Sequence, residues 1–179
     1  MKQLGLLLFC LMILIVFTSC GDEKTNQNSF EIYLVSGELL DNKNNDINKL
    51  TLEKTPILTL NDIQKYYWDK QVFITQKDLI RERIEQTGSY VGVYGLPYVV
   101  VVNGERIYMG KFWTGLSSVW AYSPSIMVDM AFVDLEQYDL QSDQQLYVVY
   151  WGSGDADTKE IVFDERIYNI LKRNNLLSN

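Results

Sequence analysis

The side chains that could do chemistry in this chain are carboxylates, hydroxyls and two cysteines, because its 179 residues include no histidine. Histidine is the commonest general base and metal ligand, so its absence excludes a Ser–His–Asp triad and disfavours the usual zinc sites. Ser117 and Ser118 lie in a Gly/Ser segment that could expose a nucleophile, but no lysine follows at the S-x-x-K spacing. We therefore expect no catalytic residue and no cofactor, and we assign both serines to turns or caps.

Oxygen-rich segments are the remaining candidates for metal binding. Four side chains match positions 1, 3, 5 and 12 of an EF-hand loop: Asn42, Asn44, Asp46 and Glu53. Position 6 is Ile47, however, where the sharp turn of that loop requires glycine. A second candidate is the D-x-D element of Asp155 and Asp157, a pattern that often occurs by chance. We expect solvated turns at both places and no metal site.

Aromatic side chains concentrate in one segment in the second half of the chain. Trp and Tyr on loops combine a large contact area with a polar tip, so they often anchor partners. Two interpretations are open: these aromatics contact a partner, or they fold back over a sheet as part of the core. The candidate partner-binding residues are Lys111, Phe112, Trp113, Trp120 and Tyr122.

The N-terminus has the pattern of an export signal. Lys2 precedes an almost unbroken apolar run at residues 4–17, which is too short to cross about 30 Å of hydrocarbon comfortably. Small residues then lead directly into Cys20. This arrangement resembles the lipobox of bacterial lipoproteins, although Phe17 stands where that motif usually has an aliphatic residue.

The lipobox resemblance implies cleavage by signal peptidase II before Cys20, whose sulfur then carries a diacylglycerol. Acyl chains of this kind anchor a protein firmly to a membrane without a spanning helix. An ordinary secretory signal that contains a cysteine, or an uncleaved anchor, are the alternatives. We expect an extracytoplasmic protein with a signal peptide at 1–19, a lipidated cysteine and flexible tether at 20–29, and a single domain at 30–179.

Processing changes the charge of the chain. Loss of Lys2 leaves 15 basic and 23 acidic side chains, a net charge of −8. Nucleic acids and anionic membrane surfaces attract basic proteins, so we expect no nucleic-acid partner, and the lipid on Cys20 must provide the anchoring. The hydrophobic fraction of 47% is enough for a packed core.

Strand and helix signals are mixed without regular alternation. They predict one α+β domain, a mainly antiparallel mixed sheet with two helices packed on one face. The predicted strands are at 30–35, 50–53, 72–75, 97–102, 106–112, 126–133 and 145–151. The pair Asn103-Gly104 predicts a tight type I′ hairpin turn. The four valines at 99–102 predict a central strand that is covered on both faces.

Two helices have capping signals. Thr75 and Asp78 have the form of a capping box at the start of a helix at 76–87, in which Arg81 and Glu85 are spaced for an ion pair.

A second helix is predicted at 165–173, capped by Asp164. Its buried stripe should be Ile167, Ile170 and Leu171. A shorter helical turn capped by Asn61 or Asp62 is expected to carry Tyr66 and Tyr67.

Short motifs between about residues 55 and 128 suggest a family. Residues 58–63 match an LT-x-x-DI pattern, 99–108 match an apolar hairpin, and Ser117-Ser118 with Pro124-Ser125-Ile126 follow it. In this order the motifs resemble the periplasmic head subdomain of SecD-type translocon components, and the chain as a whole is similar to small bacterial lipoproteins. The resemblance implies an α+β module without catalysis and supplies no site residues. The chain shows no multi-span membrane portion, so a role in export does not follow.

These observations lead to one expected function and one alternative. We expect a membrane-anchored extracytoplasmic lipoprotein whose domain is a non-catalytic binding or accessory module for a protein or cell-envelope partner. The alternative is a carboxylate-dependent cell-wall hydrolase of the glycosidase type. Such an enzyme needs two acids about 5–10 Å apart across a cleft, and the sequence singles out no pair.

Overall fold

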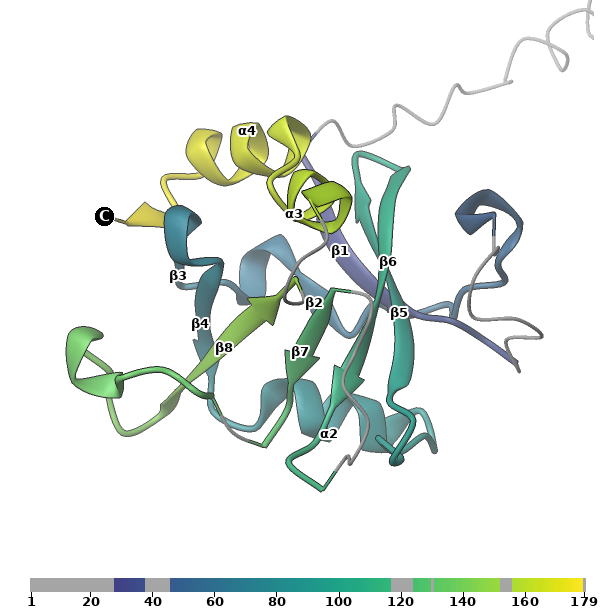
Figure 1. Ribbon diagram of the computed structural model, residues 1–179, viewed down its shortest axis with the longest axis horizontal. Helices are drawn as coiled ribbons and strands as arrows, with labels where there is room; N and C mark the ends of the chain where they lie inside the picture. Colours follow the sequence, from purple (N-terminus) through teal and green to yellow (C-terminus); the bar gives the residue numbers. More distant parts are fainter. Residues whose placement is uncertain (1–27, 38–45, 117–123, 130, 152–155, 179) are drawn as a thin grey trace, which may run out of the picture.

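One curled, mostly antiparallel sheet organises the chain in the computed structural model (Figure 1). The structure describes residues 28–37, 46–116, 124–129, 131–151 and 156–178. Within these residues the sheet has nine strands in the order β2-β1-β5-β6-β7-β8-β4-β3-β9. The strands are β1 (Phe30–Leu34), β2 (Leu58–Thr59), β3 (Lys65–Tyr67), β4 (Val72–Gln76), β5 (Leu96–Val102), β6 (Glu105–Trp113), β7 (Ser125–Met127), β8 (Gln144–Tyr150) and β9 (Leu177–Ser178).

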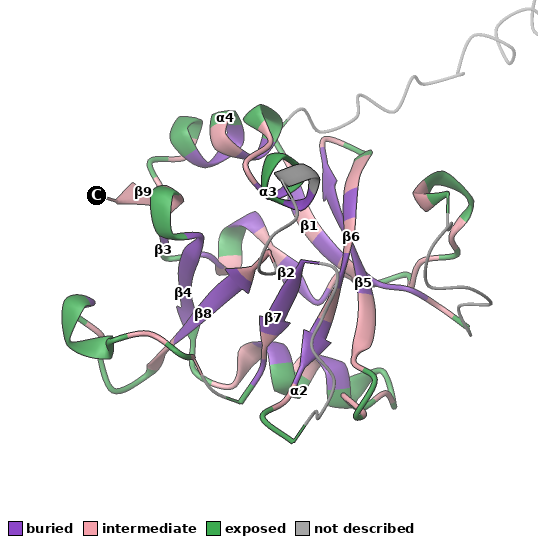
Figure 2. Cartoon of the chain, in the orientation of Figure 1, coloured by how far each residue is buried: buried purple, intermediate pink, exposed green. Residues whose placement is uncertain are grey.

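The helices lie on one face of this sheet. They are α2 (Leu79–Gln86), α3 (Ala156–Val162) and α4 (Glu165–Arg173), and short 3₁₀ turns occur at η1 (Ile47–Lys49), η2 (Leu60–Asp62), η3 (Trp68–Lys70) and η4 (Leu135–Gln137). The buried side chains of α2 and α4 join the same core cluster as the inward residues of β1, β5 and β8. Figure 2 shows these buried positions along the strands and on the inner sides of the helices. The predicted α+β domain is therefore confirmed.

The opposite face of the sheet is covered by loops and turns instead of helices. Val99 and Val101 of β5 pack there with Val35, whereas Val100 and Val102 belong to the helix-covered core. β5 lies between β1 and β6, so the predicted central strand with two covered faces is confirmed.

The β5–β6 hairpin turns where the sequence predicts. Asn103 and Gly104 both have positive φ, 51° and 81°. A type I′ turn requires this conformation at both central residues, and Asn and Gly adopt it most easily.

The observed start of α2 differs from the predicted one. Thr75 does not cap this helix, because β4 continues through Gln76 and the Thr75 hydroxyl donates a hydrogen bond to the Gln76 carbonyl oxygen. Asp78 is the N-cap residue, in the left-handed conformation and without a side-chain capping bond. The helix therefore begins three residues later than predicted.

The capping box of the chain lies elsewhere. Asp62 accepts hydrogen bonds from the backbone N–H and the hydroxyl of Thr59, both at 2.7 Å. These bonds close the 3₁₀ turn η2, and Tyr66 and Tyr67 follow in strand β3, so the predicted helical turn carrying both tyrosines is wrong.

The final helix agrees with its prediction. Asp164 accepts the backbone N–H of Arg166 and caps α4. The predicted stripe is buried: Ile167, Ile170 and Leu171.

Two predicted strands are shorter than expected. At 50–53 the structure has only an isolated bridge between Leu52 and Val35. The strand predicted at 126–133 ends at Met127, whose parallel pairing with Trp113 is closed by the hydrogen bond from the Val128 N–H to the Trp113 carbonyl oxygen. β7 pairs with β6 in parallel, as β9 does with β3, and the sheet is otherwise antiparallel.

Candidate functional site

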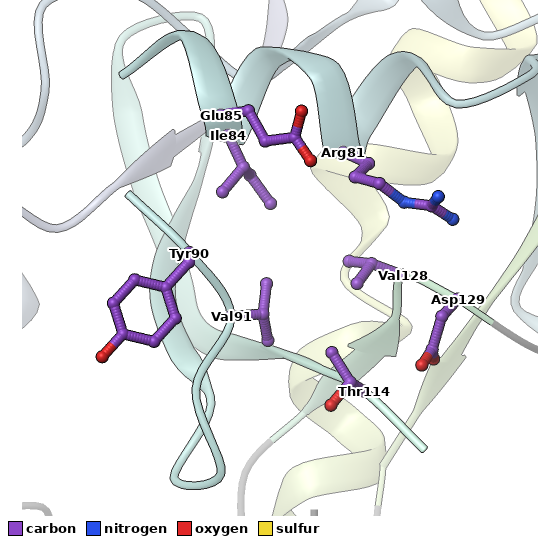
Figure 3. A pocket seen from close by; sticks show the side chains of 8 residues that line it. All are labelled: Arg81, Ile84, Glu85, Tyr90, Val91, Thr114, Val128 and Asp129. Carbon is purple, nitrogen blue, oxygen red and sulfur yellow. The ribbon is translucent and has the colours of Figure 1, made fainter. Parts of the chain in front are cut away.

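A small groove opens at the end of the sheet where β6 and β7 finish. Its volume is about 140 Å³, and Figure 3 shows α2 on one side and the segments after β6 and β7 on the other. The lining residues are Arg81, Ile84, Glu85, Tyr90, Val91, Thr114, Val128 and Asp129. The interior walls come from Ile84, Val91 and Val128, and the charged groups lie at the rim (Figure 3).

Helix α2 is held over this groove by a bidentate ion pair. Both terminal nitrogens of Arg83 donate to the Asp62 carboxylate, at 2.6 and 2.8 Å, and Arg83 also donates to the Ile57 carbonyl at 3.1 Å. Partial burial alone raises the pKa of the Asp62 carboxyl, but hydrogen bonds from Arg83 and Thr59 outweigh it and lower that pKa. The contact joins the η2 turn to α2, so it fixes the position of one groove wall.

The loop between α2 and β5 forms a second wall. Gly95 has φ of +74°, and a Cβ there would lie 3.0 Å from both the Phe112 carbonyl oxygen and the Trp113 ring. Only glycine lets the loop pass this close to β6 in that conformation. Lys111 reaches back to the same loop, since its Nζ donates to the Tyr94 carbonyl oxygen at 3.4 Å.

Asp129 is oriented at the rim by the chain that follows β6. The N–H of Gly115 donates to both carboxylate oxygens of Asp129 at 3.0 Å. This bond connects the segment after β6 to the segment after β7. The carboxylate is exposed and therefore remains open to solvent on its other side.

The rim charges are not balanced. Arg81 pairs with Asp78 at 3.3 Å, so the predicted Arg81–Glu85 ion pair is replaced by one at the start of the helix. Glu85 has no salt bridge to any described residue. The groove thus presents two carboxylates, Glu85 and Asp129, against one arginine that already has an acidic partner.

Large apolar side chains in the two chain segments that contribute Tyr90 and Thr114 to the groove face solvent. Tyr90 is 80% exposed, Tyr94 75% and Leu116 85%. Val93 is 50% exposed in the same loop as the two tyrosines. Clustered exposure of this kind on a folded domain marks an interaction surface more often than a scattered single residue does.

The residues predicted to contact a partner are placed differently. Phe112 and Trp113 end strand β6 and are buried, 0% and 5% exposed, so they belong to the core, as the second sequence interpretation holds. Lys111 is partly buried beside them, and this burial lowers the pKa of its ammonium group. Trp120 and Tyr122 lie outside the described residues.

None of the partner-binding residues predicted from the sequence lies in the loop at 88–95, which supplies Tyr90 and Val91 to the groove. The available signal was the presence of Tyr90 and Tyr94 within a glycine-rich stretch, where bulky side chains have little structure to pack against. Asp129 and Glu85 carried no signal, because tertiary structure alone brings them to one groove.

The other sequence candidates do not gather into a site within the described residues. Asp46 caps the η1 turn and pairs with Lys49 at 3.5 Å. Four candidates lie outside the described residues: Asn42, Asn44, Ser117 and Ser118. Asp155 also lies outside them, and the side chain of Asp157 is not described. Across the described part of the chain no three carboxylate, thiol or imidazole groups come together to hold a metal ion.

The opposite end of the β5–β6 hairpin holds the N-terminal end of the described chain. The N–H of Ser29 donates to Asn103 Oδ1 at 3.0 Å, and the N–H of Asn103 returns a bond to the Ser29 carbonyl at 2.9 Å. Asn28 exchanges side-chain amide bonds with Asn174 after α4, at 3.0 and 3.1 Å. The last two residues of the predicted tether are therefore fixed to the fold.

Comparison with known proteins adds no relative. No family model matches the chain. No curated protein and no solved structure matches it either. No helix among the described residues is long and apolar enough to span a bilayer.

Proposed function

We propose that this protein is a lipid-anchored extracytoplasmic binding module, which holds a protein or cell-envelope partner at the groove end of its sheet and performs no chemistry. The anchor is the lipid on Cys20, inferred from the sequence pattern before that residue. The binding surface is the groove with its exposed rim.

The observation that carries this proposal is the exposure of Tyr90, Tyr94 and Leu116, which lie in the chain segments that line the groove. Tyrosines at interface centres contribute strongly to binding because they bury a large area at low entropic cost. A chain with a well-filled core elsewhere gains nothing in stability from leaving these side chains in water.

The position of the rim relative to the anchor supports the same function. The chain enters the fold at Ser29, beside the hairpin turn at Asn103, and the groove lies at the other end of β6 (Figure 1). The nine residues of β6 span roughly 27 Å at strand geometry. A domain tethered to a membrane at its N-terminus would therefore present the groove away from the anchor.

The cavity volume favours binding over glycoside hydrolysis. Sites that enclose a small-molecule substrate have volumes of roughly 300–1,000 Å³, whereas this groove has about 140 Å³. Glu85 and Asp129 provide two carboxylates at one groove, as a hydrolase would need, but the space between the walls is too small to enclose a chain of sugar rings.

The test is site-specific photocrosslinking in the native membrane. A photoreactive amino acid at Tyr90 should give a discrete crosslinked product, and the same amino acid at Glu165, exposed at the hairpin end on α4, is the matched control. Replacement of Cys20 by Ser should abolish labelling by radioactive fatty acid.

Two results would contradict the proposal. Equal crosslinking at Tyr90 and Glu165 would remove the groove end as a binding surface. Hydrolysis of purified cell-wall glycan by the wild-type protein, abolished in Glu85→Gln, would establish the enzymatic alternative.

A further inference from the structure

We propose, on the basis of the binding function above, that the groove receives a basic polypeptide segment. One apolar side chain of the segment enters the cavity, and a neighbouring Lys or Arg contacts Glu85 and Asp129. The size of the cavity, the charge at its rim and the exposed side chain of Tyr90 all favour such a segment.

The cavity has the size of one side chain. An apolar protein cavity of about 150 Å³ holds a benzene molecule, and this groove measures about 140 Å³. Its inner walls are the apolar side chains Ile84, Val91 and Val128. A phenyl ring or a branched aliphatic side chain fills such a space, and its removal from water favours the complex.

The rim selects the charge of the segment. Arg81 is already paired with Asp78, whereas Glu85 has no salt bridge to a described residue. Asp129 accepts a hydrogen bond from the Gly115 N–H, which orients its carboxylate without neutralising it. The excess charge at the groove is therefore negative, and the chain as a whole carries −7. A cation next to the apolar side chain is the complementary group.

The exposed side chains extend the contact beyond the cavity. Tyr90 lines the groove itself, with its ring turned outward in Figure 3. Tyr94 lies four residues further along the same loop and is 75% exposed. Flanking residues of an extended segment would lie on these two rings, which also accept a cation above their faces. A polypeptide fits this arrangement because it carries apolar and basic groups at fixed, short spacing.

The experiment is selection from a random displayed heptapeptide library against the full acylated protein in detergent micelles. We expect enrichment of peptides with a large apolar residue within two positions of a Lys or Arg. A synthetic copy of the selected peptide should lose affinity by about tenfold or more when either residue is changed to Ala. Raising the salt concentration should weaken binding of the basic peptide.

Matched variants of the protein locate the contact. Glu85→Lys should reduce affinity for the selected peptide about tenfold or more, and Glu82→Lys, exposed in the same helix but outside the groove lining, should leave affinity unchanged. Val91→Phe should block the cavity and also abolish binding. The peptide substitutions test the same contacts independently if that variant fails to fold.

Four results would overturn the inference. They are enrichment of acidic or charge-free peptides, absence of any enrichment, displacement of the selected peptide by cell-wall oligosaccharides, and self-association in sedimentation that Glu85→Lys removes. If Tyr90 still crosslinks specifically to a membrane or envelope partner in any of these cases, the binding function stands and only the assigned chemistry of the partner fails.

Discussion

The two ends of the β5–β6 hairpin differ in whether their surface side chains are paired within the chain or left exposed to solvent. At the turn, polar groups are paired within the chain: Ser29 with Asn103, Asn28 with Asn174, and Arg166 with both Glu105 and Asp164. At the other end, around the groove, Tyr90, Tyr94 and Leu116 remain in solvent. Because the polar groups at the turn already pair within the chain, a binding partner would gain few hydrogen bonds or ion pairs there.

This difference separates structural residues from binding residues. Contacts that the chain satisfies internally should contribute to stability and not to recognition. Side chains that the chain leaves exposed should contribute little to stability and much to recognition. Substitutions at the two ends, and in β6 between them, test that distinction.

The largest effect on stability is expected at Gly110 in β6, the strand that runs between the two ends. A Cβ on Gly110 would lie 2.4 Å from the Tyr98 ring and 2.5 Å from the Pro124 carbonyl oxygen. Gly110→Ala should therefore destabilise the domain by about 3 kcal/mol, measured by urea unfolding, and disturb both ends together. Gly92→Ala, whose new Cβ meets only the Tyr90 ring at 3.4 Å, is the control. Equal stability of the two variants would contradict the close packing at Gly110.

The next effect is expected at the ion pair that positions α2. Asp62→Ala removes the partner of Arg83 and the acceptor of Thr59, so it should lower the free energy of unfolding by about 2 kcal/mol. Glu53→Ala, for a carboxylate outside every described salt bridge, should change it by less than about 0.5 kcal/mol. Binding at the groove should weaken in Asp62→Ala, because one wall loses its support.

The same carboxylate predicts a pH dependence. The pKa of Asp62 is lowered in the folded state, so its contribution is complete above the unfolded pKa, near pH 4, and is lost as the pH falls through the lower folded value. Wild type should therefore lose more stability than Asp62→Asn between about pH 5 and pH 2. Parallel stability curves for the two proteins in urea titrations across this range would show that the ion pair is not the cause.

A smaller effect is expected at the cap of α4. Asp164→Ala removes the acceptor of the Arg166 N–H and one of the two partners of the Arg166 guanidinium. It should lower the free energy of unfolding by about 1 kcal/mol. Groove binding should stay intact, because Asp164 lies at the end of the domain that holds the hairpin turn. Glu165→Ala is the exposed neighbour that serves as a control. A loss of binding in Asp164→Ala would show that the two ends are coupled.

The smallest effect on stability is expected at the rim. Tyr90→Ser and Tyr94→Ser remove highly exposed rings, so each should change the free energy of unfolding by less than about 0.5 kcal/mol. Each should nevertheless reduce capture of the crosslinked partner and binding of the selected peptide. If either substitution destabilised the domain by more than about 1 kcal/mol, the rim would belong to the core.

The sequence predicts the parts of this fold that depend on local pattern. Asp164 as a cap and the buried stripe of α4 follow from helical periodicity, and the turn at Asn103 follows from its φ preference. The start of α2 was mispredicted because Thr75 satisfies the pattern of a capping box while its backbone is committed to a strand between β3 and β8.

The groove could not be predicted because it depends on distant contacts. Glu85 and Asp129 are far apart in the chain. The packing of α2 on the sheet brings Glu85 to the groove, and the parallel pairing of β6 and β7, for which the sequence has no local signal, brings Asp129 there. Phe112 and Trp113 had the composition of an exposed anchor, but both are buried: Phe112 joins the helix-covered core, and the Trp113 ring lies against the loop at Gly95.

The docking of Asn28 and Ser29 has a mechanical consequence. β1 begins directly after them and pairs over five residues with β5, from Phe30 opposite Val102 to Leu34 opposite Tyr98. Tension applied to the chain at Asn28 acts along this strand and shears the ladder, so that all five pairs resist at once and do not open one after another. A domain pulled between its N-terminal attachment and a load at the far end of the hairpin would bear the force in its strongest direction.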